Sequence, residues 1–153
     1  MAASEPEAAG GGGFEPVDHT ADLALRIWAP DLEGLFRQAA RGMMGLVTEP
    51  GAVRPEGQYE LTIAGIDLEE LLVSWLGELL YRLETEQLLL TECRRLRIER
   101  GPGGFRLTAT MRGEPFDARR HRLAAEIKAA TYHGLRIAPG TEGGYEVTVV
   151  FDT

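Results

Sequence analysis

The sequence predicts a single α+β domain in which a mostly antiparallel or mixed sheet of about six strands packs with two main helices. Three observations lead to this prediction. The 153 residues match the length of one domain, two segments place apolar residues at helical spacing, and about six short segments alternate apolar and polar residues. Because an alternating strand is apolar on one face only, the helices are expected to cover that face.

The chain begins with a segment that is predicted to stay outside the folded domain. Residues 1–13 consist mainly of Ala, Gly, Glu and Pro and offer little apolar surface to bury. They predict a disordered tail, followed by one domain at residues 14–153. The first clear strand is Leu23–Trp28, whose odd-numbered positions are all apolar, and Pro30 ends it.

Two helices are predicted from capping residues that precede apolar stripes. Asp31 is a suitable N-cap for a helix of about three turns that runs to Met43. Asp67 is the expected cap of a longer helix, Leu68–Leu83, and Glu70 is placed to complete a capping box. The second helix carries the wider apolar stripe, so it is predicted to lie in the core.

The remaining strands follow the same alternation. Tyr59–Ala64 precedes the second helix, Leu88–Ile98 and Phe105–Met111 flank a Gly- and Pro-rich turn as a hairpin, and Tyr145–Phe151 is the last strand. Leu123–Ile137 also alternates and is predicted to be a strand, although its Ala residues leave a helix open there.

Composition and charge exclude several classes of protein. A net charge of −8 argues against wide contact with nucleic acid, and no apolar run approaches the roughly 20 residues that cross a membrane. The single Cys93 cannot form an internal disulfide and is expected to pack in a strand, so the protein is predicted to be cytoplasmic. The dense basic cluster Arg119–Arg122 is typical of a solvated surface, with a local RNA contact as the alternative.

Two short segments at opposite ends of the chain suggest a cation site. Asp18–Asp22 lies just before the first clear strand, and Phe151–Thr153 ends the last strand. If these strands are neighbours, Asp22 and Asp152 meet at one rim of the sheet, where two carboxylates can hold a hard divalent cation. Asp residues at strand ends also commonly form turns, so the residues alone leave both interpretations open.

Several segments together give the chain a resemblance to a known family. They are Asp18–Asp22 (DHTAD), Leu71–Leu76 (LLVSWL), Gly113–Pro115 (GEP), Ile127–His133 (IKAATYH) and Phe151–Asp152 (FD). In order and spacing, the chain from Phe14 onward resembles the archease family. The DHTAD and KAATYH segments are specific as a pair, far more so than a single Gly-rich loop.

This resemblance implies an accessory protein that is not itself an enzyme. Archeases assist the RtcB-type RNA ligase, which joins RNA ends in tRNA splicing, tRNA processing and RNA repair. They promote guanylylation, in which GTP and a divalent metal charge the active-site histidine of the ligase, and they allow multiple turnover. The expected partners are the ligase and, through it, GTP and RNA, with weak or no direct binding to nucleic acid.

The resemblance also implies a metal site. It maps onto Asp22, Asp152 and the main-chain oxygen of Thr153, with calcium as the expected cation and magnesium or manganese as alternatives. These donors leave much of a shell of roughly six to eight oxygens to water or to a partner. Thr153 stands where archeases are expected to have an aliphatic residue, but a main-chain oxygen does not depend on the side chain. Gly77 replaces an expected Asn and lowers helix propensity.

Four further residues are candidates for supporting this site or contacting the partner. His19 could orient a ligand, and Asp18 is typical of a turn. Lys128 could pair with a carboxylate or a phosphate, or it could be a plain surface lysine. His133 falls on the apolar-leaning face of its predicted strand, which favours a buried core histidine over a functional one.

Two other classes of function remain as alternatives. An independent metal-dependent phosphohydrolase would use Asp22, Asp152 and Lys128, but the sequence has no nucleophile motif, Walker loop or histidine metal cluster to support it. An RNA-binding chaperone would use Arg119–Arg122, which the acidic net charge disfavours.

Overall fold

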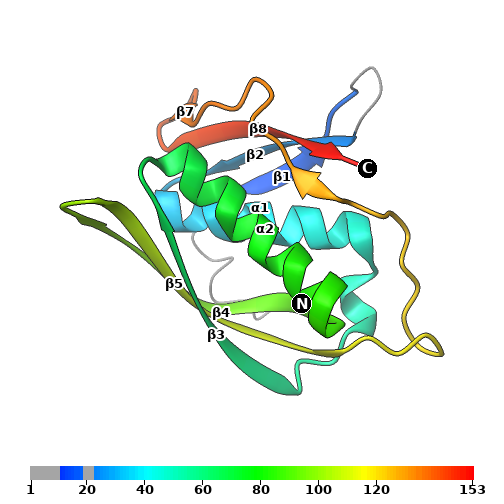
Figure 1. Cartoon of the computed structure of the whole chain (residues 1–153). Helices are drawn as coiled ribbons and strands as arrows, with labels where there is room; N and C mark the ends of the chain where they lie inside the picture. Colours follow the sequence, from blue (N-terminus) through cyan, green and yellow to red (C-terminus); the bar gives the residue numbers. More distant parts are fainter. Residues whose placement is uncertain (1–10, 19–22) are drawn as a thin grey trace.

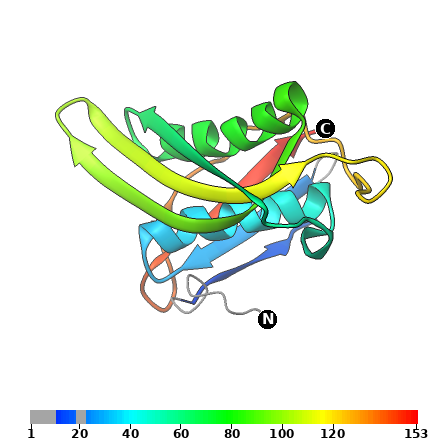
Figure 2. The ribbon, with the colours of Figure 1, turned by 90° about the horizontal axis from the view of Figure 1, so that it is seen from below.

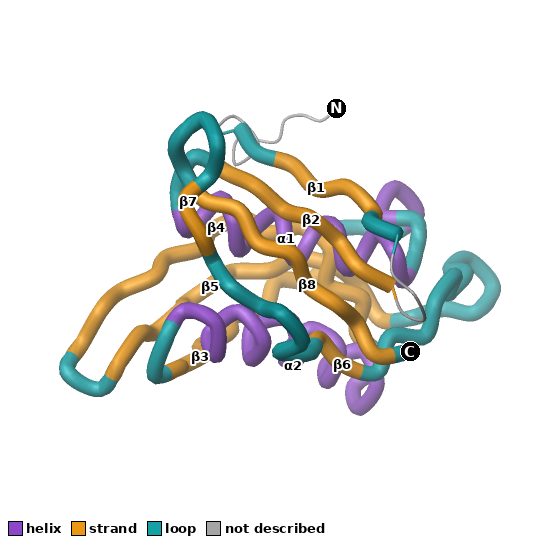
Figure 3. Tube along the Cα trace, turned by 90° about the horizontal axis from the view of Figure 1, so that it is seen from above, coloured by secondary structure: helices purple, strands orange, loops and turns teal. Residues whose placement is uncertain are grey.

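The strands form two antiparallel sheets with two helices between them in the computed structural model, which describes residues 11–18 and 23–153 (Figure 1). The first sheet has the order β1-β2-β8-β6, with β7 also paired to β8. Its strands are β1 Gly13–Pro16, β2 Leu23–Ala29, β6 Ala129–Ala130, β7 Ala138–Pro139 and β8 Tyr145–Asp152. Figure 3 shows that β8 runs between β2 on one side and β6 and β7 on the other.

The second sheet has the order β3-β5-β4, with β3 at Gly57–Gly65, β4 at Leu88–Gly101 and β5 at Gly104–Pro115. β4 and β5 form the predicted hairpin, and Gly104 at its tip has a φ of +130°, a conformation that favours glycine. Figure 2 shows that this long, curved hairpin extends past the helices. The predicted α+β class with two main helices is confirmed, but the strands are divided between two sheets.

Both helices begin at the predicted capping residues. Helix α1, Leu32–Val47, starts after Asp31, whose carboxylate accepts a hydrogen bond from the main-chain N of Gly34 at 2.7 Å. Helix α2, Leu68–Glu86, starts after Asp67, whose carboxylate accepts a hydrogen bond from the main-chain N of Glu70 at 2.8 Å. The Glu70 carboxylate reaches back to the main-chain N of Ile66 at 2.6 Å, one residue before the expected partner. A short 3-10 helix, η2, occupies Pro50–Ala52.

The core lies between the two sheets and is organised around the helices. Helix α1 contacts β2 and β8 of the first sheet and β4 of the second, and α2 contacts β3, β4, β5 and β6. Phe36 and Trp75 are fully buried, and the Trp75 Nε1 donates a hydrogen bond to the Phe36 main-chain oxygen at 3.0 Å. Cys93 is buried in β4, as its predicted packing role requires. Within the described residues, no helix is long and apolar enough to cross a membrane.

The prediction of a continuous strand at Leu123–Ile137 is wrong. Only Ala129–Ala130 pairs as β6, and Leu123 makes a single bridge to Thr48. Gly134 adopts a φ of +60°, and the main-chain N of Leu135 donates to the Tyr132 oxygen at 3.0 Å. This turn reverses the chain direction locally, so that a strand cannot continue through it.

The start of the chain shows one element that the sequence did not predict. β1 begins at Gly13, the last residue of the predicted tail, which pairs with Trp28 of β2. β1 is short and contains Gly and Pro, so it lacks the alternation that identifies a strand. Residues 1–10 lie outside the described part of the chain, and the predicted tail stays a prediction.

Candidate functional site

The end of β8 is the part of the predicted cation site that the structure describes. Asp152 closes β8 opposite Ala129 of β6, and Thr153 follows it. The main-chain oxygen of Asp152 accepts a hydrogen bond from the main-chain N of Lys128 at 2.7 Å. Asp152 and Thr153 are both exposed. The Asp152 carboxylate and the Thr153 main chain therefore lie at the rim of the first sheet, where both residues are exposed to solvent.

Asp22, the second predicted carboxylate, lies outside the described residues, as does His19. Leu23, which follows Asp22 in the sequence, pairs with Phe151, which precedes Asp152. β2 and β8 are antiparallel neighbours, so the first residues of β2 meet the last residues of β8. The neighbouring strands are confirmed, and the shared cation stays a prediction.

The described donors are of the type that a hard cation prefers, because calcium, magnesium and manganese favour carboxylate and carbonyl oxygens. Within residues 11–18 and 23–153, no three His, Cys, Asp or Glu side chains form a group that could hold a metal. A cation bound at Asp152 would therefore need further oxygens, from the undescribed residue Asp22, from the main chain, from water or from a partner.

The remaining candidate residues lie in different places. Lys128 is exposed just before β6, and Asp18 is exposed after β1. His133 is exposed in the turn after β6, so the expectation that it is a core histidine is wrong. Its main-chain N donates to the hydroxyl of Thr131 at 3.3 Å, and that hydroxyl donates to the Val150 main-chain oxygen at 2.9 Å. The hydroxyl of Thr131 thus ties the turn to β8.

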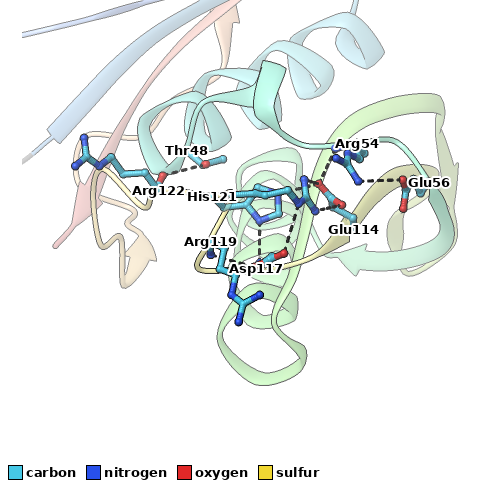
Figure 4. A network of polar contacts seen from close by, with 9 residues as sticks. Thr48, Arg54, Glu56, Glu114, Asp117, Arg119, His121 and Arg122 are labelled. Carbon is cyan, nitrogen blue, oxygen red and sulfur yellow. Dashed lines mark hydrogen bonds and ion pairs between the residues drawn. The ribbon is translucent and has the colours of Figure 1, made fainter.

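A second polar site, which sequence reasoning missed, is centred on Glu114 near the end of β5 (Figure 4). Glu114 is only 3% exposed. The guanidinium of Arg120 donates to both carboxylate oxygens, at 2.6 and 3.1 Å, and the main-chain N of Arg54 donates at 2.8 Å. The Nε2 of His121 lies 2.8 Å from the same carboxylate. Such donors offset the cost of removing a carboxylate from water.

These contacts determine the charge of the site. The hydrogen bonds from Arg120 are the main reason that the pKa of Glu114 falls from 4.5 to about 2. The main-chain N–H of Arg54 and the ring of His121 lower it as well, while burial acts in the opposite direction. The pKa of Arg120 is raised by the same pairing. Glu114 and Arg120 are therefore a charged pair at neutral pH.

His121 is a structural member of this network. Its side chain is fully buried, and its Nδ1 accepts a hydrogen bond from the main-chain N of Asp117 at 2.9 Å. The ring proton therefore resides on Nε2, which donates to Glu114. The Asp117 carboxylate lies 3.4 Å from the Nε of Arg120. Both ring nitrogens are satisfied in the neutral form.

The basic cluster Arg119–Arg122 is thus divided between two roles. Arg120 and His121 face Glu114, whereas Arg119 and Arg122 are exposed. The interpretation as a solvated surface holds for only part of the cluster. The available signal was a Glu at the end of an alternating strand, followed after a short Pro-containing loop by Arg and His.

Fold and site together define a small α+β protein that presents oxygen ligands at the meeting point of an early and a late strand. The model of the archease protein family (MTH1598/TM1083) matches residues 14–153. The chain belongs to the archease family.

Relatives from distant organisms support this membership. The chain is 39% identical to "Protein archease" of Methanopyrus kandleri over 126 residues, which are 81% of this chain and 88% of the relative. It is 36% identical to "Protein archease-like" of Drosophila melanogaster over 91% of this chain and 89% of the relative. The solution structure of Methanobacterium thermoautotrophicum protein 1598 superposes with a TM-score of 0.77 at 30% identity, covering 92% of this chain and 99% of that one.

Proposed function

We propose that this archease-family protein activates an RtcB-type RNA ligase by promoting its metal- and GTP-dependent guanylylation, and that it is not itself the catalyst. The observation that carries the proposal is the register of β2 and β8, in which Leu23 faces Phe151. This register is the reason to propose that Asp22, which precedes β2, and Asp152, which ends β8, donate to one cation. The family resemblance supplies the ligase as the partner and the cytoplasm as the place of action.

The proposed cation ligands are the carboxylates of Asp22 and Asp152 and the main-chain oxygen of Thr153. When bound, a divalent cation supplies positive charge that can bridge phosphate or partner oxygens. Asp152 and Thr153 are exposed, so they are accessible to a partner. Lys128 is tied through its main chain to Asp152, and its ammonium could pair with a phosphate in the complex. Calcium is the proposed cation, with magnesium or manganese as alternatives.

The test compares the wild-type chain with Asp152→Asn in one guanylylation assay and one melting assay. A substoichiometric amount of wild-type chain should raise the guanylylated fraction of the ligase, and the chain alone should not turn over GTP. Cation at about 100 times its dissociation constant should stabilise the wild-type chain by about 2.7 kcal/mol. Asp152→Asn should stay folded but lose the cation response and the stimulation together.

Glu142→Gln is the matched control, because Glu142 is an exposed carboxylate in the loop before the opposite end of β8. This variant should behave as the wild type in both assays. Full stimulation by an Asp152→Asn protein without a cation response would disprove the proposed site. GTP hydrolysis by the chain alone, lost in Asp152→Asn, would instead favour a phosphohydrolase.

A further inference from the structure

An apolar groove lies beside the proposed cation site, between the C-terminal end of α2 and residues 116–128. Its cavity volume is about 500 Å³. Three buried side chains, Val47, Leu80 and Ile127, contribute to its lining, and half-buried Phe116 also lines it. Grooves of this kind accept the apolar face of a helix or an extended segment of another protein.

Leu123 lines this groove and is 46% exposed, although a large apolar side chain is normally buried. The segment that carries Leu123 has almost no regular secondary structure, yet it is held at several points. The main-chain N of Ala124 donates to the Val47 oxygen at 2.7 Å, and the hydroxyl of Thr48 donates to the Arg122 oxygen at 3.1 Å. The Glu114 network anchors the residues just before Leu123 (Figure 4). Leu123 is thus presented in a preorganised position.

The polar residues that line the groove are exposed, and they are two carboxylates, Glu84 and Glu126, one amide, Gln87, and one cation, Lys128. Glu84 and Glu126 line it, and neither forms an ion pair with any residue that the structure describes. By contrast, Glu78 and Glu86, on the same helix as Glu84, both pair with Arg82. The rim therefore offers two carboxylates to a basic partner.

We propose that this groove is the docking site for a segment of the ligase that inserts apolar side chains against Leu123 and carries Lys or Arg residues toward Glu84 and Glu126. The inference rests on the proposed function. Apolar contact would supply most of the affinity, and the carboxylates would orient the segment. Lys128 lines the groove and also bonds through its main chain to Asp152, so a docked segment would lie beside the proposed cation site.

The test measures binding of the full-length chain to the purified ligase, together with the concentration of chain that half-saturates guanylylation. Leu123→Asp should raise both the dissociation constant and this concentration about tenfold or more, because it places a charge against the apolar side chains of the docked segment. Its response to cation in the melting assay should remain that of the wild type. The altered side chain is partly solvated, so the fold should tolerate it.

Ile66→Asp is the matched control. Ile66 is 72% exposed and lies before the N-terminus of α2, whereas the groove lies at its C-terminal end. These sites are separated by a helix of 19 residues, which spans about 28 Å. The double variant Glu84→Lys with Glu126→Lys tests the charges independently, and it should weaken binding in low salt more than in high salt.

The outcomes separate this inference from the proposed function. If the wild-type chain does not stimulate the ligase, the proposed function is wrong and the inference is wrong with it. If the wild type stimulates and Leu123→Asp does so at the same concentrations, only the groove inference is overturned. Equal weakening by Ile66→Asp would also overturn it. So would conversion of a self-associating chain to a monomer by Leu123→Asp with unchanged ligase binding, since the groove would then join two copies of this chain.

Discussion

Glu114 illustrates how a single side chain can hold a loop in place. Its carboxylate accepts hydrogen bonds from Arg120 and His121, in the segment after β5, and from the main-chain N of Arg54, in the segment before β3. Two loops that are distant in sequence are therefore joined through one buried charge. The cost of removing either partner is high, because the other would remain buried without its donors or acceptor.

We predict that Glu114→Gln lowers the melting temperature by several degrees at pH 7, because the neutral amide cannot accept the same set of hydrogen bonds. The pKa of Glu114 is lowered to about 2 from 4.5. Its ionised form therefore stabilises the fold fully above pH 4.5, and this contribution is lost as the pH falls toward 2. Melting curves at pH 7, 4.5 and 3 should show the difference between wild type and variant shrinking with acidity.

Glu60→Gln is the control for this experiment. Glu60 is an exposed carboxylate that accepts hydrogen bonds from the hydroxyl of Thr110 at 3.0 and 3.1 Å, and it forms no ion pair with a cationic side chain in the described part of the chain. Its replacement should alter the melting temperature little at any pH. A Glu114→Gln deficit of the same size at pH 3 and pH 7 would show that the charge of Glu114 is not what stabilises the loop.

The histidines show where sequence reasoning fails for individual residues. Alternation placed His133 on an apolar face, whereas the turn at Gly134 leaves it exposed. His121, in a sequence crowded with arginines, is the buried one. Local polarity does not reveal burial when the partner, here Glu114, lies across a loop. By contrast, the structure does pair β2 with β8, which was the condition for placing Asp152 at a sheet rim next to β2.

Glycines inside the two helices offer a test at the level of the element. A Cβ added at Gly77 in α2 would meet nothing within 4 Å, so Gly77→Ala should stabilise the protein by about 0.5–1 kcal/mol. A Cβ at Gly42 in α1 would come within 2.8 Å of Leu25 and 2.9 Å of Phe14, so Gly42→Ala should destabilise it by about 1–3 kcal/mol. Denaturant unfolding measures both.

Gly45→Ala gives the internal comparison, because Gly45 lies in the same helix as Gly42 but faces open space. It should behave like Gly77→Ala. If Gly42→Ala were as stabilising as Gly45→Ala, α1 could not pack as closely against Leu25 of β2 and Phe14 of β1 as the structure shows.

The helices were more predictable than some strands. Each helix has a capping Asp and a long stripe of apolar residues, and both features can be identified from neighbouring residues in the sequence alone. The segment Leu123–Ile137 also carries a periodic pattern, but its main chain is hydrogen-bonded at separate points to Val47, to β8 and to Glu69 of α2, without a continuous ladder. Period alone cannot distinguish a paired strand from an extended loop.

For the whole molecule, the number of layers could not be predicted from the sequence. The wide stripe on α2 indicated a buried helix but not that it would contact both sheets. Assignment of strands to one sheet or the other depends on pairing between distant segments, for which a single sequence gives no local signal. The α+β class, in contrast, follows from the elements themselves.

The charge of the whole protein predicts weak binding to RNA. The affinity for a single-stranded RNA should be low in about 0.15 M salt. The net charge is −8, so the acidic side chains outnumber the Lys and Arg side chains that could displace counterions from the RNA phosphates. Residual binding should fall in the double variant Arg119→Ala with Arg122→Ala, whose side chains are exposed. A gel-shift titration measures this. Tight binding that these changes leave intact would contradict it.

The position of β8 between β2 and β6 has a consequence for biosynthesis. During translation, both helices and the whole second sheet are made before Tyr145–Asp152, so β2 lacks β8 as a partner until these elements have been made. In that interval the side of α1 that β2 and β8 cover is left incompletely shielded. The nascent protein therefore passes through a stage in which part of its apolar surface is uncovered, and surfaces of this kind favour aggregation.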